Sequence, residues 1–185
     1  MPAAPKPVIQ VILEAFTKSK GKTVDLVVEH DELIGITPEM YQWWGSSIND
    51  SERYRMWCPE DHISFSWEVP PSKAGSTGAI QMAEEKIGEF PASVLRIRRE
   101  DQDSLGIPRK YTTYRVSAFL GPDNITVAWV SHEFESGANG MKMLSTFRFP
   151  AKVPAQFLKA MHKHCRTEMG HLPEFLPKLY RERYV

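Results

Sequence analysis

The chain has 185 residues, a length that corresponds to about one domain. Its 23 Lys and Arg residues balance 23 Asp and Glu residues, and this lack of net positive charge argues against a nucleic-acid-binding protein. Hydrophobic residues make up 42% of the sequence, enough for a packed core, but no apolar run approaches the roughly 20 residues that a membrane-spanning helix requires.

The start of the sequence and its cysteines indicate the compartment. Residues 1–10 do not combine a basic segment with an apolar stretch, so they do not resemble a secretory signal. Cys58 and Cys165 are too few to build a disulfide framework. We therefore expect residues 1–185 to form a single cytoplasmic domain with no membrane or nucleic-acid partner; a homodimer is compatible with the sequence.

The N-terminal part predicts a loose arm followed by short helical segments. Residues 1–7 contain three prolines and should form the arm. Residues 8–16 form an apolar run that fits either a helix or a strand. A helix is predicted from Thr37-Pro38 to about Gly45, because Thr37 can cap it and Pro38 suits its first turn.

The middle of the chain alternates apolar and polar residues, which is typical of half-buried strands. From Ile63 to Val69 every second residue is apolar, and Pro70-Pro71 end this run. Turn signals rich in glycine and proline separate further runs of the same kind. The expected strands cover residues 63–69, 78–88, 91–99, 110–119, 124–134 and 141–149.

After Pro150 the apolar spacing becomes helical. Pro154 suits a first turn, and one stripe of residues then recurs at spacings of four, three, four and four. The stripe consists of Phe157, Met161, His164, Glu168 and Leu172. Its apolar start should face the core, so Phe157 and Met161 are expected to be buried. The element order predicts the α+β class, with a long C-terminal helix packed on a curved, mostly antiparallel sheet.

Within this stripe, His164 and Glu168 lie one helical turn apart. An imidazole and a carboxylate at this spacing point the same way and can bind one metal ion. An ordinary His–Glu surface pair has the same spacing, so the pattern alone leaves both interpretations open. His162 and His171 fall off the stripe and are expected at the surface.

Further candidate ligands lie in the predicted strands. His62 opens the first clear strand, and the neighbouring Asp61 is close enough to contact it. Glu84 and Glu85 are adjacent in an otherwise apolar strand, so one of the two must face inward. His132 lies in a strongly apolar strand, where it is either a core histidine or a catalytic residue.

Several segments, taken in order, resemble one known family. Tyr54-Arg55-Met56-Trp57-Cys58-Pro59-Glu60-Asp61-His62 is similar to a motif that usually reads Tyr-x-x-Trp-His-Pro-x-Asp-His, with Cys58 in place of the first histidine. Residues 132–147 and 164–180 resemble a later strand pair and the C-terminal helix and tail of the same proteins. Together with Trp43-Trp44 and Glu52-Arg53 upstream, these segments resemble the diacetylphloroglucinol and phloretin hydrolases over residues 36–180.

This resemblance implies a Bet v 1-like, helix-grip fold with an internal cavity that contains zinc. It implies the ligands His62, Glu85, His164 and Glu168, with Glu84 as the alternative to Glu85; another divalent metal could replace zinc. It also places Tyr54 and His132 in the substrate site. The expected function is hydrolysis of the C–C bond between an acyl group and an aromatic or polyketide-type ring.

The residues themselves are suited to this chemistry. His132 can move a proton, because imidazole titrates near neutral pH, and Tyr54 can hydrogen-bond a substrate oxygen. The aromatic side chains expected to contact a flat substrate are Trp43, Trp57 and Trp129. Two other functions stay open: a polyketide-type cyclase or isomerase on the same metal-containing scaffold, and a non-catalytic carrier of a hydrophobic ligand.

Overall fold

The computed structural model describes residues 4–72 and 75–183. Within these residues, eight strands form one antiparallel sheet in the order β1-β8-β7-β6-β5-β4-β3, and β2 also pairs with β8. The strands are β1 (Thr23–Glu29), β2 (Leu33–Ile34), β3 (His62–Val69), β4 (Ile80–Ile87), β5 (Phe90–Arg99), β6 (Thr113–Leu120), β7 (Thr126–Ser136) and β8 (Gly140–Pro150). The helices are α1 (Val8–Ser19), α2 (Pro38–Ser47), α3 (Ser51–Trp57) and α4 (Ala155–Glu182), with a 3-10 turn at Pro122–Asn124.

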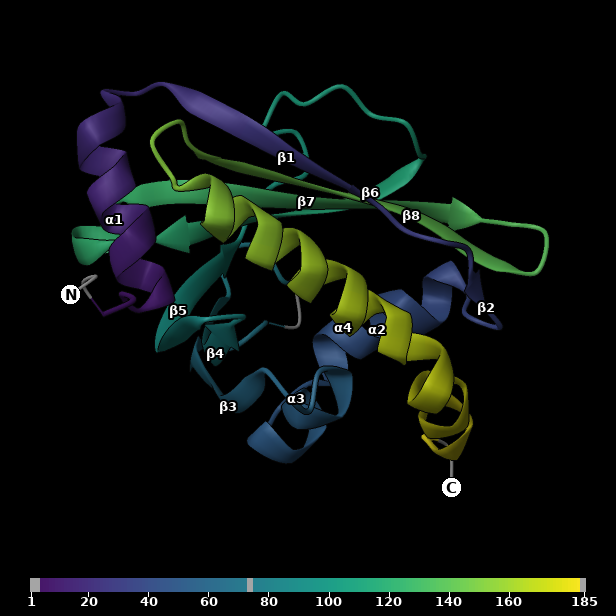
Figure 1. Ribbon diagram of the computed structural model, residues 1–185. Helices are drawn as coiled ribbons and strands as arrows, with labels where there is room; N and C mark the ends of the chain where they lie inside the picture. The colour runs from purple at the N-terminus through teal and green to yellow at the C-terminus, as the bar shows by residue number, and fades with distance from the viewer. Residues whose placement is uncertain (1–3, 73–74, 184–185) are drawn as a thin grey trace.

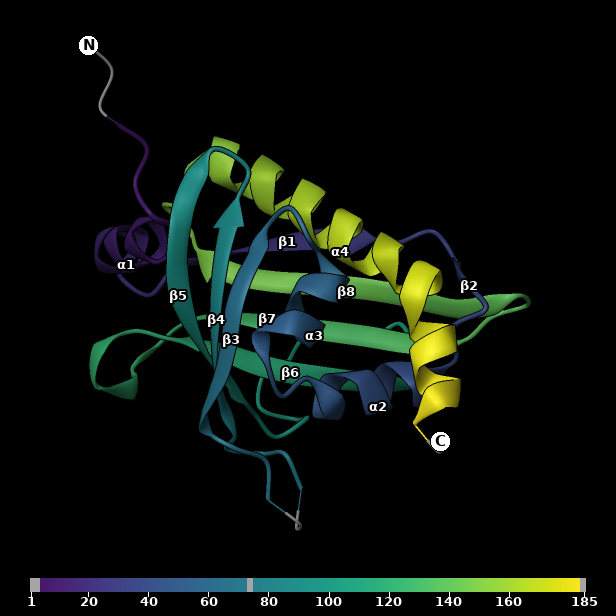
Figure 2. The same cartoon turned by 90° about the horizontal axis from the view of Figure 1, so that it is seen from below.

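The long helix α4 runs along the sheet, and α2 and α3 pack against it (Figure 1). In Figure 2 the strands β3, β4 and β5 run across the direction of β6, β7 and β8, so the sheet bends around α4. The α+β class and the curved sheet with a long C-terminal helix are therefore confirmed. None of the helices in the described ranges is long and apolar enough to cross a membrane.

Local sequence signals explain where the helices begin. The Thr37 hydroxyl accepts a hydrogen bond from the Met40 backbone N–H at 3.3 Å, and Pro38 occupies the first turn of α2, as predicted. The Asp50 carboxylate caps α3 in the same way, accepting from the Arg53 N–H at 2.8 Å. These two caps fix the short helices that lead into β3.

The stripe on α4 faces the core, as expected. The exposed fraction is 0% for Phe157 and 2% for Met161. The Phe157 ring packs edge-on against Phe90 of β5 and Phe149 of β8, with both ring centroids 5.3 Å away. The helix therefore binds both arms of the bent sheet through one aromatic side chain.

The N-terminal third differs from the sequence expectations. The apolar run 8–16 belongs to helix α1, and β1 and β2 were not predicted as strands. Of the expected loose arm, residues 4–7 lie in no helix or strand, and residues 1–3 lie outside the described residues. The expected strand 110–119 begins only at Thr113, because the backbone N–H groups of residues 110 and 111 bind the buried Glu133 carboxylate instead of a neighbouring strand.

Candidate metal centre and cavity

Three elements bring four predicted ligands together. His62 and Glu85 are direct partners in the antiparallel pairing of β3 with β4, so both side chains lie on the inner face of the sheet. His164 and Glu168 reach the same place from one face of α4. The exposed fractions of the four residues lie between 2% and 9%, so the cluster is buried.

The two histidines and the two glutamates face one another: each imidazole contributes its Nε2 atom and each carboxylate contributes one oxygen. His62 Nε2 lies 3.5 Å from Glu168 Oε2, and His164 Nε2 lies 3.5 Å from Glu85 Oε2 and 3.9 Å from Glu168 Oε2. The ligand atoms of His62, His164 and Glu168 lie within 4.8 Å of one another. This spacing is that of donor atoms arranged around a common centre.

Both imidazoles are oriented by a bond at the opposite nitrogen. His62 Nδ1 faces the backbone carbonyl of Tyr54 at 3.1 Å, and His164 Nδ1 faces Asp61 Oδ2 at 2.9 Å. An Nδ1–H that donates to an oxygen leaves a lone pair on Nε2, which is how protein carboxylates and carbonyls orient metal-binding histidines. Among the described residues His62 Nε2, although buried, has no hydrogen-bond partner.

These residues fit a divalent cation. A buried carboxylate requires a compensating charge, and here the carboxylates of Glu85 and Glu168 face the Nε2 atoms of two imidazoles. A donor set of two histidines and two carboxylates suits zinc and also other divalent first-row metals.

The geometry separates Glu85 from Glu84. Glu85 points inward to His164, whereas Glu84 lies on the other face of β4 and accepts a hydrogen bond from the Ser64 hydroxyl at 2.8 Å. Nearby charge and hydrogen bonding both change the pKa of Glu85. Burial opposes ionisation of Glu85, but hydrogen bonding to His164 and the nearby His62 lower its pKa to about 2.

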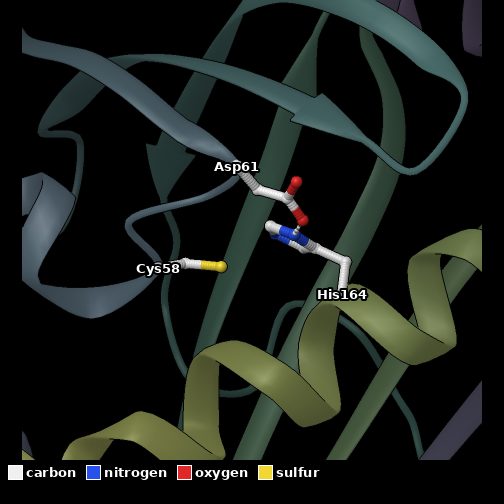
Figure 3. Close-up of side chains that lie close together, drawn as sticks. All are labelled: Cys58, Asp61 and His164. Atoms are coloured by element: carbon white, nitrogen blue, oxygen red, sulfur yellow. Dashed lines mark hydrogen bonds and ion pairs between the residues drawn. The ribbon is translucent and has the colours of Figure 1, made fainter.

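The loop before β3 supplies the support for His164 (Figure 3). The sequence suggested a contact between Asp61 and His62, and the structure corrects this: Asp61 binds His164, 103 residues away in sequence. Burial disfavours protonation of His164, but the Asp61 carboxylate and further hydrogen bonds raise its pKa well above the ordinary value. Without a cation, Nε2 therefore holds a proton toward Glu85, at the position where a cation would take the lone pair. Cys58 lies beside this pair and forms with it a second group of close donor atoms.

Tyr54 is built into the wall of the centre. Its ring stacks on the His62 imidazole, with centroids 4.0 Å apart and planes 4° from parallel, and its hydroxyl donates to Glu85 Oε1. Burial and the Glu85 charge raise the pKa of the Tyr54 hydroxyl well above its usual range. Tyr54 therefore remains a hydrogen-bond donor at neutral pH.

His132 lies on β7 and contacts the cavity but not the four-residue cluster. Its Nδ1 lies 2.8 Å from the hydroxyl of Ser145, its cross-strand partner, and the same hydroxyl lies 2.9 Å from His30 Nε2. Burial lowers the pKa of His132 to about 3 and that of His30 to about 4. Both imidazoles are thus neutral near pH 7. Ser145 falls within the segment 132–147 that resembles the hydrolase family, but it was not singled out there, and nothing in the sequence pointed to His30.

A cavity of about 200 Å³ connects the centre with His132. Its wall includes Tyr54, Trp57, Glu85, His132, His164 and Glu168, and its apolar part includes Ile97, Phe119, Val130, Phe147 and Met161. The wall also includes Arg99 and Arg115, which no motif in the sequence indicated.

Two of the three tryptophans expected to contact substrate lie elsewhere. Trp57 lines the cavity, but Trp43 and Trp129 do not. Trp129 alternates with Val130 along β7, so it lies on the opposite face of the sheet, near Ile80 and Leu120. Tyr41 and Gly45 are the α2 residues that line the cavity, one helical turn apart, and Trp43 lies between them on another side of the helix. Its ring packs against the Tyr180 ring of α4, with centroids 5.4 Å apart.

Solved structures of the same fold belong to the helix-grip class. They include Ara h 8.0201 (TM-score 0.56, 10% identity, covering 85% of this chain and 98% of that chain). A START superfamily protein from Mycobacterium smegmatis gives a TM-score of 0.55 at 13% identity (86% and 99% covered). A protein from Nitrosomonas europaea gives 0.54 at 12% (86% and 97% covered). At these identities the likeness shows the fold alone: a Bet v 1-like sheet that grips a C-terminal helix.

The sequence identifies the family within this class. The family model described as the DAPG hydrolase PhiG domain matches residues 19–157, and the chain belongs to this hydrolase family, as the motifs predicted. No curated protein matches the sequence. The matched range includes His62 and Glu85 but ends before His164, so the placement of the α4 pair rests on the geometry described above.

Proposed function

We propose that this chain is a metal-dependent hydrolase that cleaves the C–C bond between an acyl group and an aromatic or polyketide-type ring. Membership in the DAPG hydrolase family supports the class of reaction. The observation that carries the proposal is the convergence of His62 Nε2, His164 Nε2 and two carboxylates at the wall of a buried cavity.

The proposed reaction consumes one water. The bond between the ring carbon and the carbonyl carbon breaks, the water oxygen bonds to the carbonyl carbon, and the ring carbon gains a proton, so a carboxylic acid and the free ring leave. A divalent cation held by His62, Glu85, His164 and Glu168 would supply Lewis acidity at the ketone oxygen and lower the pKa of a bound water.

Asp61 and Tyr54 would position the ligands of this centre. Asp61 holds the His164 ring so that Nε2 points at Glu85 and Glu168. Tyr54 fixes His62 twice, by ring stacking and by accepting from Nδ1 through its backbone carbonyl. Its hydroxyl, which donates to Glu85, is also a cavity-lining donor that can turn to an oxyanion of the substrate.

His132 would move the proton that the ring carbon gains. As a neutral imidazole it can accept a proton at one nitrogen while the other exchanges with the Ser145 hydroxyl. Ser145 and His30 continue this line of polar groups away from the cavity. Phe147 and Val130 belong to the apolar part of the cavity wall, where the substrate ring would pack.

Metal content and acid release, measured together, test the proposal. Protein purified without added metal should contain close to one equivalent of a divalent metal and should release a short carboxylic acid from an acylphloroglucinol or a dihydrochalcone. Protein that holds the metal but releases no acid from these ketones would favour the cyclase or isomerase. Protein that neither retains nor takes up metal after zinc soaking would contradict the hydrolase and favour the carrier.

A further inference from the structure

Two arginines, Arg99 of β5 and Arg115 of β6, line the cavity away from the candidate metal centre. Glu85 of the centre pairs with Ser93 on β5, and Arg99 lies six residues further along that strand. Because this offset is even, both positions lie on the same face of the bent sheet, at different points along the cavity. The cavity therefore has a carboxylate and imidazole end and a guanidinium end.

Neither guanidinium is paired with a carboxylate in the described part of the chain. Arg115 Nη2 donates to the backbone carbonyls of Tyr41 at 3.2 Å and Gln42 at 2.6 Å, and Arg99 Nη2 donates to the carbonyl of Gly45. These acceptors belong to α2, whose C-terminal end offers only partial negative charge. A guanidinium has five N–H donors, so each retains donors for a further partner.

The surrounding residues are shaped to admit these two side chains. A side chain at position 45 would collide with the Arg115 guanidinium, so Gly45 makes room for it against α2. Arg115 also lies over the Tyr41 ring at 4.9 Å, and Arg99 lies over the Trp67 ring at 5.2 Å. Burial lowers the pKa of both arginines, and for Arg99, at about 10, the charge of Arg115 contributes. Two buried cations that act on one another and lack a carboxylate partner are unfavourable until an anion joins them.

The position of the pair relates it to the proposed chemistry. Arg115 is the direct cross-strand partner of His132, the residue proposed to move the proton. Arg99 and Arg115 also line a second, more open pocket of about 420 Å³ that shares Ser76, Gln102 and Tyr114 with the cavity. An anion can therefore reach the two guanidinium groups from the surface.

We propose that Arg99 and Arg115 form an anion-binding pole of the cavity that holds an oxyanion, phenolate or carboxylate, on the ring of the substrate. The proposal deepens the hydrolase function and rests on it for the identity of the other end of the substrate. A planar oxyanion matches the parallel N–H donors of a guanidinium. Selection would favour ketones with an ionised ring oxygen or ring carboxylate over their neutral ethers and esters.

Binding of matched anionic and neutral probes to the zinc-loaded protein tests this pole. The probes are benzoate with methyl benzoate, and para-nitrophenolate with para-nitroanisole, each measured by calorimetry. The wild type should bind the anion of at least one pair more tightly than its neutral partner, and the pair that shows the preference distinguishes carboxylate from phenolate. Arg99→Met and Arg115→Met should each weaken binding of that anion on the order of tenfold to a hundredfold, with the neutral probe unchanged within about twofold.

Matched variants make the result specific. Arg96→Met removes an arginine from the same strand, but one that is paired with Glu68 at 2.5 Å, and should leave both affinities unchanged. Arg115→Lys should retain part of the anion preference, because it keeps the charge and loses the fork of donors. Zinc content and thermal unfolding, measured on every variant, identify any that fails to fold, and Arg99→Met or Arg115→Lys then carries the test.

The outcomes separate the pole from the hydrolase. An anion preference that survives both methionine variants, or equal losses for anionic and neutral probes, would overturn the pole even if the wild type cleaves ketones. An arginine-dependent preference in a protein that releases no acid would keep the pole and overturn the hydrolase. No preference in the wild type for either anion would also overturn the pole.

Discussion

At the scale of single residues, the candidate centre depends on which nitrogen of each histidine is engaged. The bonds from His62 Nδ1 to the Tyr54 carbonyl and from His164 Nδ1 to Asp61 leave both Nε2 atoms facing carboxylates. The sequence could supply the four ligand candidates, but not Asp61 as the partner of His164. That contact joins residues 103 positions apart and depends on how α4 docks.

The adjacent pair Glu84 and Glu85 allows a sharp test of the ligands. Glu85→Gln should lower metal affinity at least about tenfold, because it removes a buried negative charge that faces His164, and turnover should fall with it. Glu84→Gln is the control, since that carboxylate binds Ser64 on the other face of the strand. Metal content after dialysis against a weak chelator measures the difference. Equal retention by the two variants would exclude Glu85 as a ligand.

The contact between His132 and Ser145 predicts a kinetic effect without loss of metal. His132→Ala should keep the metal and slow turnover roughly a hundredfold to ten-thousandfold, the usual range for general acid–base residues. Ser145→Ala should keep the metal and slow turnover less, and Ser145→Thr should restore most of it because the hydroxyl returns. Metal loss in His132→Ala as complete as in His164→Ala would make His132 a ligand. Full activity in His132→Ala would make it an ordinary core histidine.

At the scale of elements, the spacing of apolar residues predicted α4 and β3 but missed β1. The four-three-four-four stripe identified the buried face of α4, and alternation identified β3. Apolar residues also alternate in β1, at Val24, Leu26 and Val28. However, β1 is an edge strand in which only Val28 is buried, so its two faces differ little in burial. The same rule of alternation, applied to β7, places Trp129 opposite His132 and explains why that tryptophan does not reach the cavity.

The packing of helix α4 on the sheet can be tested with one substitution. Phe157→Ala should lower the free energy of unfolding by about 3–5 kcal/mol, because a fully buried ring that contacts Phe90 and Phe149 leaves a cavity. Lys159→Ala on the exposed face of the same helix is the control. Urea unfolding of both variants gives the two differences. A loss below about 1 kcal/mol for Phe157→Ala would contradict the packing described.

At the scale of the whole molecule, two buried neutral histidines predict acid sensitivity. Folding lowers the pKa of His132 from about 6.5 to about 3 and that of His30 to about 4. The unfolded chain therefore binds more protons between these limits, so stability present above pH 6.5 is lost progressively as the pH falls toward 4. Replacing either histidine by glutamine should flatten the decline by up to about 1.4 kcal/mol per pH unit.

Unfolding curves of the wild type and each variant, measured between about pH 7 and pH 4, give this slope directly. The comparison with the wild type removes the contribution of the carboxylates, which titrate in the same range in all proteins compared. If a variant loses stability with falling pH as steeply as the wild type does, then the histidine that it lacks binds a proton as readily in the folded protein as in the unfolded chain.

Architecture was more predictable than the site, for a physical reason. The bent sheet and its helix follow from short-range patterns, and four ligands could be named from motifs in the sequence. The pole of Arg99 and Arg115 could not, because an arginine in a strand gives no sign of whether a carboxylate will meet it. Only the fold shows that α2 offers them carbonyls instead.

The distribution of the ligands between β3, β4 and α4 has a mechanical consequence. An ion bound by His62 and Glu85 on one side and by His164 and Glu168 on the other would act as a reversible cross-link closing a loop of about a hundred residues between positions 62 and 168. Removing the ion with a chelator would break this cross-link and weaken the attachment of the middle of α4 to the sheet. Proteases that attack transiently detached helices should therefore cleave α4 of the stripped protein faster than α4 of the loaded one, while the strands β6, β7 and β8 keep their resistance.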